Sequence, residues 1–421
     1  MSQTGPIRTH RLANGLRVVM APDARVPLVG LSMSYAVGSA DEEPGRTGFA
    51  HLFEHMMFQG SANVGKTEHL TALEAIGGDA DATTDWDTTV YTDVVPSHQL
   101  PLALWLEADR LATLHEAITQ ETLDNQREVV KNERQGAIEN VPYGGAEDEL
   151  FALAFGDGHP YSHSVNGLMA DLDAATLPEV LAFFETWYRP SNVVMSLVGD
   201  LDPEPTLELV ERYFGAIPGG ATPSRPIVPA DAGARRRTIV SDEVPAAKLF
   251  LGCVIEPFGT DEWATADFAV DLLTAGSASR LQRRLVRELR LADDVAALAY
   301  PLAAGNAVVE IDVEAAEDAD PEAVEAALFA ELDRLVSEPP EEEELARIRL
   351  RRETERAGTM EIASERAERI GMYASLLDEP ERFGQETARD RAITAEAIAA
   401  LGAGPFSASN RVALWYLPSG E

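Results

Sequence analysis

Residues 49–58 read Phe49-Ala50-His51-Leu52-Phe53-Glu54-His55-Met56-Met57-Phe58, and this apolar stretch predicts a helix that carries two histidines. On a helix, His51 and His55 lie one turn apart and project from one face, at a separation that two ligands of one zinc ion can use. Glu54 stands beside His55 and can reach a water molecule at the same ion. The order H-x-x-E-H is the inverse of the commoner H-E-x-x-H zinc motif. The alternative is a pair of ordinary packed or solvated histidines.

A catalytic zinc ion takes three protein ligands and keeps one position open for water. The third ligand is expected from residues 122–139, which have a helical pattern. Val129 and Val130 would face a core, and this orientation places Glu133 one turn away, on or near the same side. Glu128 is the competing ligand, because helices carry many solvated glutamates. The pattern favours Glu133 and leaves Glu128 open.

The chain has 421 residues, with 34 Lys and Arg against 71 Asp and Glu, and a formal net charge of −37. The length suggests two or three domains, and the acidic balance argues against binding nucleic acid or an anionic membrane surface. No apolar stretch approaches the roughly 20 residues that span a bilayer, and residues 1–6 lack the parts of a secretory signal. Cys253 is the single cysteine, which excludes an internal disulfide and a cysteine-based metal cluster. We therefore expect a cytoplasmic protein.

Strand and helix patterns recur in both halves of the chain. Asn14-Gly15 predicts a β-hairpin, because this dipeptide is a strong hairpin-turn signal. The strands expected in the first half are 9–12, 16–20, 29–37, 83–94 and 193–198, and its further helices are 67–76, 100–115, 122–139 and 178–186. In the second half we expect strands at 248–254 and 308–314, helices at 263–273 and 279–291, and a helix that begins at the acidic run 341–344.

Pro and Gly cluster between Ile217 and Gly233, which predicts a linker. Ser191-Asn192 and Ser409-Asn410 each follow a predicted helix and open a last apolar strand, and the offset between the two pairs is about half the chain. We therefore expect an α+β fold of two homologous domains, each an antiparallel-rich β-sheet flanked by helices. The expected limits are 1–216 for an N-terminal zinc-binding domain, 217–235 for the linker and 236–421 for a C-terminal domain without metal.

The segment 49–58 resembles the zinc helix of the M16 metallopeptidases, the pitrilysin, insulin-degrading and mitochondrial-processing type enzymes, which are also called inverzincins. The resemblance covers most of the chain, and the length suits the shorter two-domain bacterial type. It extends through Val37-Gly38-Ser39, Gly45-Arg46-Thr47-Gly48, Gly77-Gly78, Thr84, Thr89-Val90-Tyr91, Val129-Val130-Lys131-Asn132-Glu133, Tyr188-Arg189-Pro190-Ser191-Asn192 and Gly276-Ser277-Ala278-Ser279-Arg280-Leu281.

The resemblance implies that His51, His55 and Glu133 bind one zinc ion per chain and that Glu54 is the general base. It thereby implies a zinc metallopeptidase, a metalloendopeptidase that hydrolyses peptides or unfolded protein segments. In many relatives a second glutamate lies seven residues before the third ligand, and Gln126 at this position cannot ionise. The alternative, from a different class, is a non-catalytic structural or peptide-binding subunit of an M16-like complex.

In this family the substrate adds as a β-strand to an edge strand near the zinc. The corresponding stretch here is 77–84, so that Asp81, Ala82, Thr83 and Thr84 are the expected substrate-binding residues. Relatives commonly have Asn at the position of Asp81. An acid there either favours basic residues in the substrate or is simply a solvated carboxylate.

Active relatives also place an Arg and a Tyr from a C-terminal half across the cleft from the zinc. The equivalent region, 283–295, is rich in arginine, but Asp293 or a neighbour stands at the Tyr position and the nearest tyrosine is Tyr300. A missing oxyanion donor can cost on the order of 10²–10³ in rate. We therefore expect the metal-bearing subunit of a heterodimer, in which a homologous M16-like chain supplies Arg and Tyr, with a homodimer as the second possibility.

Overall fold

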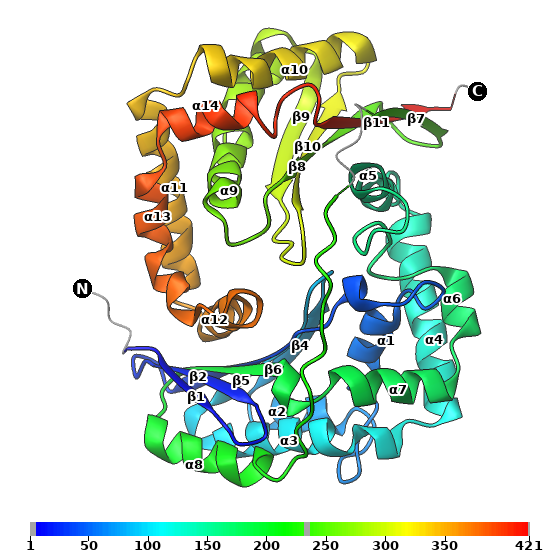
Figure 1. Cartoon of the computed structure of the whole chain (residues 1–421), viewed down its shortest axis with the longest axis vertical. Coiled ribbons are helices and arrows are strands. Elements are labelled where there is room, and N and C mark those ends of the chain that lie inside the picture. The colour runs from blue at the N-terminus through cyan, green and yellow to red at the C-terminus, as the bar shows by residue number, and fades with distance from the viewer. Residues whose placement is uncertain (1–5, 231–235, 420–421) are drawn as a thin grey trace. The chain divides into compact units, whose positions relative to one another are not determined.

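The computed structural model describes residues 6–230 and 236–419, which form two compact units, each built around one β-sheet (Figure 1). The first unit comprises the described residues of Met1–Glu133, Ser164–Arg225 and Arg356–Gln385. The second comprises those of Arg134–His163, Pro226–Glu355 and Glu386–Glu421. Each sheet is mostly antiparallel and is covered by helices, so the expected α+β fold class is confirmed.

The two sheets have the same strand order over five strands. In the described residues the first sheet runs β1-β2-β6-β3-β5-β4 and the second runs β7-β11-β8-β10-β9. In each sheet one pair is parallel, β2 with β6 and β7 with β11, and the other pairs are antiparallel. The strands of the first sheet are β1 (Arg8–Arg11), β2 (Arg17–Pro22), β3 (Leu28–Tyr35), β4 (Asp79–Thr84), β5 (Thr89–Pro96) and β6 (Val193–Gly199). Those of the second are β7 (Arg236–Asp242), β8 (Lys248–Ile255), β9 (Ala292–Ala299), β10 (Ala307–Ala315) and β11 (Arg411–Pro418).

Helices make up most of the remaining chain. Those that lie mainly in the first unit are α1 (Phe49–Met56), α2 (Glu68–Ala75), α3 (Leu100–Ala117), α4 (Gln120–Arg134), α6 (Met169–Ala174), α7 (Leu177–Trp187), α8 (Pro203–Phe214) and α12 (Ala363–Leu377). Those of the second are α5 (Ala146–Phe155), α9 (Asp261–Thr274), α10 (Pro321–Ser337), α11 (Glu342–Thr359), α13 (Glu386–Ala392) and α14 (Ala395–Ala403). Two short segments, Gln135–Glu139 and Gln282–Glu288, are π-helical.

The same side-chain hydrogen bonds recur in the two units at the offset that the sequence predicts. Asn192 Nδ2 donates to the carbonyls of Ala36, at 3.1 Å, and Trp187, at 3.0 Å. Asn410 Nδ2 donates to the carbonyls of Val254 and Pro405, both at 2.6 Å. Each acceptor in the second unit follows its counterpart in the first by the same number of positions as Asn410 follows Asn192. This repeated detail supports the duplication that the sequence predicts.

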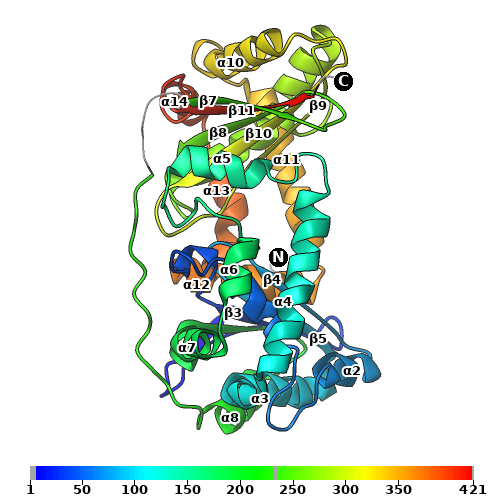
Figure 2. The same cartoon turned by 90° about the vertical axis from the view of Figure 1, so that its right-hand side faces the viewer.

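One helix on each sheet comes from the other half of the sequence. Helix α12 packs on β3 and β6 of the first sheet, as the orange ribbon against the blue and green strands shows in Figure 1. Helix α5 packs on β8 and β11 of the second sheet, visible as the teal ribbon in Figure 2. Their first residues, Ala146 and Ala363, are separated by nearly the same offset as the two asparagines, so the two helices are counterparts in the repeat.

Strands β2 and β6 of the first sheet are apolar on both faces, which is why helices cover both faces of the sheet. Val18 and Met20 pack in the main core with α1, α3, α7 and α8, whereas Val19 and Ala21 pack against α12. Small residues let α12 lie close to β3. A Cβ at Gly30 would come within 2.6 Å of the backbone of Ala363, so this contact requires glycine.

A buried ion pair also joins α12 to the first sheet. Arg366 Nη1 donates to Asp23 Oδ2 at 2.5 Å, and the two side chains are only 3% and 6% exposed. Arg25 binds the same carboxylate, and together these partners hold the pKa of Asp23 well below its usual range. An ion pair this deep is costly to break from one side, because the remaining charge stays in the core.

Two parts of the expected element order are wrong. The single strand expected at 83–94 is two strands, β4 and β5, joined by a turn at 85–88; β4 alternates small and polar residues and lacks a strong strand signal. The helix expected at 279–291 ends at Glu288, and strand β9 follows at Ala292. This strand is missed because alanine and aspartate are poor strand formers.

Each compact unit includes a segment from the other half of the sequence, Arg356–Gln385 in the first unit and Arg134–His163 in the second. The expected domain limits 1–216 and 236–421 follow the two halves of the sequence instead, and they stay a prediction. Residues 231–235 of the expected linker lie outside the described residues. Within the described ranges, none of the helices combines the length and the apolar character that crossing a bilayer requires.

The pair of Asp23 and Arg366 yields a stability test. We expect Arg366→Ala to lower the free energy of unfolding by about 2 kcal/mol, less than the full cost of breaking a buried pair because Arg25 still faces Asp23. The matched control is Arg369→Ala, an exposed position on the same helix, which should change it by less than about 0.5 kcal/mol. Equal effects in urea denaturation would contradict the role assigned to the pair.

Candidate metal centre

Helix α1 turns an apolar face to the core and its two histidines to one other face. Leu52, Phe53 and Met56 are fully buried in the core of the first unit. At its start, the carboxylate of Glu42 accepts hydrogen bonds from the backbone N–H groups of Gly48, at 2.8 Å, and Ala50, at 2.7 Å. A carboxylate at this end satisfies free N–H groups and suits the positive end of the helix dipole. The core contacts and this cap fix the orientation of α1.

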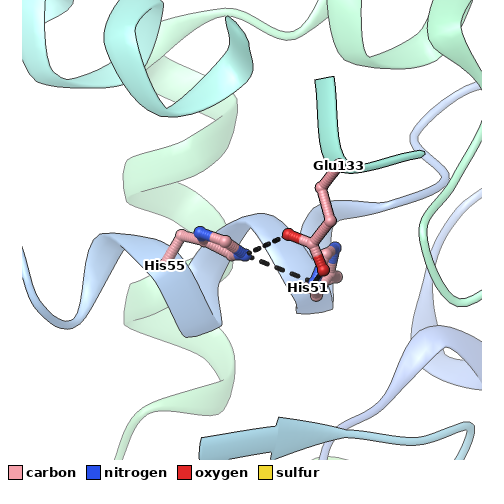
Figure 3. A group of neighbouring side chains, drawn as sticks. All are labelled: His51, His55 and Glu133. Carbon is pink, nitrogen blue, oxygen red and sulfur yellow. Dashed lines mark hydrogen bonds and ion pairs between the residues drawn. The ribbon is translucent and has the colours of Figure 1, made fainter. Parts of the chain in front are cut away.

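The structure brings His51, His55 and Glu133 together, as Figure 3 shows. The Nε2 atoms of the two histidines are 3.3 Å apart. Glu133, near the end of α4, lies with Oε2 3.2 Å from His55 Nε2 and Oε1 3.7 Å from His51 Nε2. Ligands of a tetrahedral zinc ion with bonds near 2.0–2.1 Å are roughly 3.3–3.5 Å apart, so these three groups have ligand spacing.

Burial keeps the two imidazoles neutral. Burial, together with the neighbouring His55, lowers the pKa of His51 to about 4. It also lowers the pKa of His55, against the opposing effect of Glu133. A neutral imidazole offers a nitrogen lone pair to a metal. Glu133 is 44% exposed, which leaves the group open on one side. Two such nitrogens and one carboxylate fit the donor set of a catalytic zinc site.

Glu54 lies beside this group and is held by a threonine from β4. Thr84 Oγ1 donates to Glu54 Oε2 at 2.6 Å. Burial raises the pKa of Glu54 to about 7, an effect that the hydrogen bond from Thr84 opposes and the charge of Glu133 reinforces. A carboxyl group that titrates near neutrality can both accept and release a proton there.

Of the two acids that the sequence pattern leaves open, the structure brings Glu133 to the histidines. Glu128 instead lies 3.4 Å from Lys131 Nζ in an exposed ion pair on the same helix. Gln126, at the position where many relatives have a second glutamate, is buried.

The four expected substrate-binding residues lie on β4, which stands at the edge of the first sheet in the described residues. Asp81 and Thr83 are on its exposed face, whereas Ala82 and Thr84 face inward and are partly buried. Ala82 packs against the main core, and Thr84 contacts Glu54. The sequence alone does not predict the hydrogen bond between Thr84 and Glu54 or the helix cap by Glu42. Each of these interactions joins residues that only the fold brings together.

The region of the expected arginine and tyrosine lies in the second unit. Asp293 is an exposed residue of β9, and Arg283, Arg284 and Arg287 lie on the π-helical segment before it. The hydroxyl of Tyr300 is hydrogen-bonded to Glu147, at 2.7 Å, and Glu310, at 2.9 Å. Burial, reinforced by these carboxylates, raises the pKa of Tyr300. Its hydroxyl is therefore engaged within the second unit.

Known proteins resemble this chain over both halves. Residues 17–160 match the family described as Insulinase (Peptidase family M16), and residues 174–351 match the family described as Peptidase M16 inactive domain. Zinc protease PqqE of Helicobacter pylori is 29% identical over 286 residues, which span 67% of this chain and 64% of that protein. Mitochondrial-processing peptidase subunit beta of Lentinula edodes is 27% identical over 270 residues, or 61% of this chain and 54% of that protein. The matched parts thus span less than two thirds of these relatives.

The fold is also that of a solved structure, the crystal structure of a protease from Helicobacter pylori. The two superpose with a TM-score of 0.92 at 24% sequence identity, over 98% of this chain and 100% of that one. The matches to the two M16 domains together span about three quarters of the sequence. The chain belongs to peptidase family M16.

Proposed function

We propose that this chain is a zinc-dependent metalloendopeptidase that hydrolyses peptides or unfolded protein segments. The observation that carries the proposal is the convergence of His51, His55 and Glu133 at ligand spacing, beside the partly buried carboxyl group of Glu54. The names of the relatives, several of which are called zinc proteases, support the same metal and chemistry.

Each residue has a defined role in this proposal. His51, His55 and Glu133 hold the ion. When bound, zinc supplies a Lewis acid that lowers the pKa of water toward about 7 and polarises the peptide carbonyl. Glu54 accepts the proton that the attacking water gives up and then delivers it to the nitrogen of the leaving amine. Thr84, hydrogen-bonded to Glu54, keeps the carboxyl group in one orientation.

We also propose β4 as the strand on which the substrate binds. Its outer edge offers backbone N–H and C=O groups to an extended peptide, which would extend the first sheet by one strand. Asp81 and Thr83 on its exposed face then lie beside the substrate's side chains. The negative charge of Asp81 favours basic residues there.

The active form proposed is a heterodimer with a homologous M16-like chain. Its basis is the contrast between a full set of metal ligands and a second unit in which Asp293 is exposed and the hydroxyl of Tyr300 is bound to Glu147 and Glu310. The relative named as subunit beta of a processing peptidase supports an assembly of unlike chains. A homodimer is the second possibility. The cytoplasmic location expected from the sequence stays a prediction.

Removing a metal ligand tests the site. We expect Glu133→Gln and His51→Ala each to lower the zinc content by about one ion per chain, because two ligands hold zinc far more weakly than three. The matched control is Glu128→Gln on the same helix, which should keep the zinc content of the unchanged protein. Metal analysis after dialysis measures all four proteins, and loss of zinc in the control alone would point to Glu128 as the ligand.

The base is tested separately from the metal. Glu54→Gln preserves the size of the side chain but cannot take a proton, so hydrolysis of a quenched peptide should fall by about 10²–10⁴-fold. The zinc content should stay unchanged, because Glu54 is not a ligand. Activity at the level of the unchanged protein would exclude Glu54 as the base.

The subunit role is tested with the chain alone and then with an M16-like homologue from the same genome. We expect the mixture to cleave a quenched peptide about 10²–10³-fold faster, because the homologue supplies the oxyanion donor. Full activity of the single chain, with no gain from the homologue, would refute the two-chain proposal. Bound zinc without hydrolysis in either sample would favour the non-catalytic alternative.

A further inference from the structure

A second group of metal-binding side chains lies in the first unit, formed by residues outside the His51 group. It comprises His69 on α2, Asp93 on β5 and Glu107 on α3. These side chains are 6%, 1% and 0% exposed, respectively. The group is therefore enclosed in the core, unlike the site at Glu133.

The distances from His69 to the two carboxylates exceed a hydrogen bond and fit side chains that bind one metal ion. His69 Nε2 lies 3.7 Å from Asp93 Oδ1 and 3.7 Å from Glu107 Oε1. The same distance separates His51 and Glu133 in the first site. An N–H···O hydrogen bond would be 2.7–3.2 Å long, so His69 makes none to either carboxylate. Among the described residues, His69 Nε2 and both oxygens of an ionised Asp93 lack a hydrogen-bond partner.

The charges of the group do not balance by themselves. Arg110 binds Glu107 through Nε, at 2.9 Å, and through Nη2. Its guanidinium lies over the ring of Tyr91, 4.5 Å from the centroid, so its position is fixed. Arg110 offsets one carboxylate, and burial lowers the pKa of His69 to about 3, which keeps that ring neutral. With both carboxyl groups ionised, one negative charge in this dry core would lack a partner, and a bound cation would supply it.

We propose that His69, Asp93 and Glu107 form a second, structural site for a small divalent cation such as Zn²⁺. One imidazole nitrogen and two carboxylate oxygens are a donor set that zinc and manganese accept. Arg110 then acts as the group that orients Glu107, in the way that hydrogen bonds orient metal-bound carboxylates. Full enclosure makes this a closed site without access for a substrate.

A proton shared by Asp93 and Glu107 is the competing way to supply the missing charge. Burial raises the pKa of Asp93 to about 6 and that of Glu107 to about 7, so a carboxyl pair could retain one proton near neutrality. A shared proton does not involve His69. The equal distances from His69 Nε2 to both carboxylates are what a metal explains and a proton does not.

The ion would join α2, β5 and α3, and α2 contacts the residue Phe58 just after helix α1. His69 packs edge-on to Phe58, which follows α1, with ring centroids 6.1 Å apart. Thr67 N–H donates to the Phe58 carbonyl at 3.2 Å. A metal at His69 would thus fix α2 against the sheet and hold the chain where α1 ends.

The test counts ions in the full-length chain purified from cells supplied with Zn²⁺. We expect about two zinc ions per chain in the unchanged protein and about one in the double variant His51→Ala/His55→Ala, which destroys the first site. Asp93→Asn added to this double variant should remove the remaining ion. An asparagine at this position matches a protonated aspartate in size and shape, so it is the least disruptive change of this ligand. The matched control is Asp109→Asn, a buried acid on α3 outside the group, which should keep both ions.

The accessibility of the two sites gives a second readout. A short exposure to EDTA should release the ion at the open first site and leave the enclosed one. If the double variant carries no zinc, the second site is refuted and the shared proton explains the cluster. If the double variant keeps the zinc content of the unchanged protein and the added Asp93→Asn removes zinc, the second site stands and the first fails. Should Asp93→Asn not fold, His69→Gln replaces it in the same comparison.

Discussion

Strands β2 and β6 carry apolar side chains on both faces, so each face of the first sheet must be covered before that unit is stable. Helix α1 is one of the helices that cover the main-core face of the sheet. Burial of Leu52, Phe53 and Met56 fixes its rotation about its own axis, and the period of the helix then places His51 and His55 together on another face. The metal-binding geometry is thus a consequence of how the sheet is covered. The packing of α4 then has only to place Glu133, near the end of this helix, beside the two histidines.

Local patterns predicted those parts of the structure that depend on neighbouring residues. The hairpin at Asn14-Gly15 and the helix with His51 and His55 depend on turn chemistry and on periodicity, and both were correct. The choice between Glu133 and Glu128 needed the packing of α4, which one sequence does not contain. Strand β9 was missed because its pairing with β10, rather than its own residues, makes it a strand. The cluster at His69 joins three distant elements and has no sequence signal at all.

Polar side chains inside the first unit give its core a defined arrangement. The hydroxyl of Tyr91 donates to the Phe53 carbonyl at 3.4 Å and lies 3.2 Å from the hydroxyl of Tyr188. Arg110 packs on the same Tyr91 ring and binds Glu107. Burying such groups without partners is costly, so few packings satisfy all of them. The backbone of α1 is therefore tied to a specific arrangement of sheet and helices, which a uniformly apolar core would not enforce.

The exchange of α5 and α12 has a consequence for how the chain folds during translation. The strands of the first sheet are complete at Gly199, whereas α12 ends only at Leu377, about 180 residues later in synthesis. Until then Val19, Ala21, Val194 and Val198 have no cover on their face of the sheet. The N-terminal part leaves the ribosome first but closes its core late, through contacts of high sequence separation. A nascent chain of this protein therefore carries an uncovered apolar sheet for much of its synthesis, a state in which chaperones protect against aggregation.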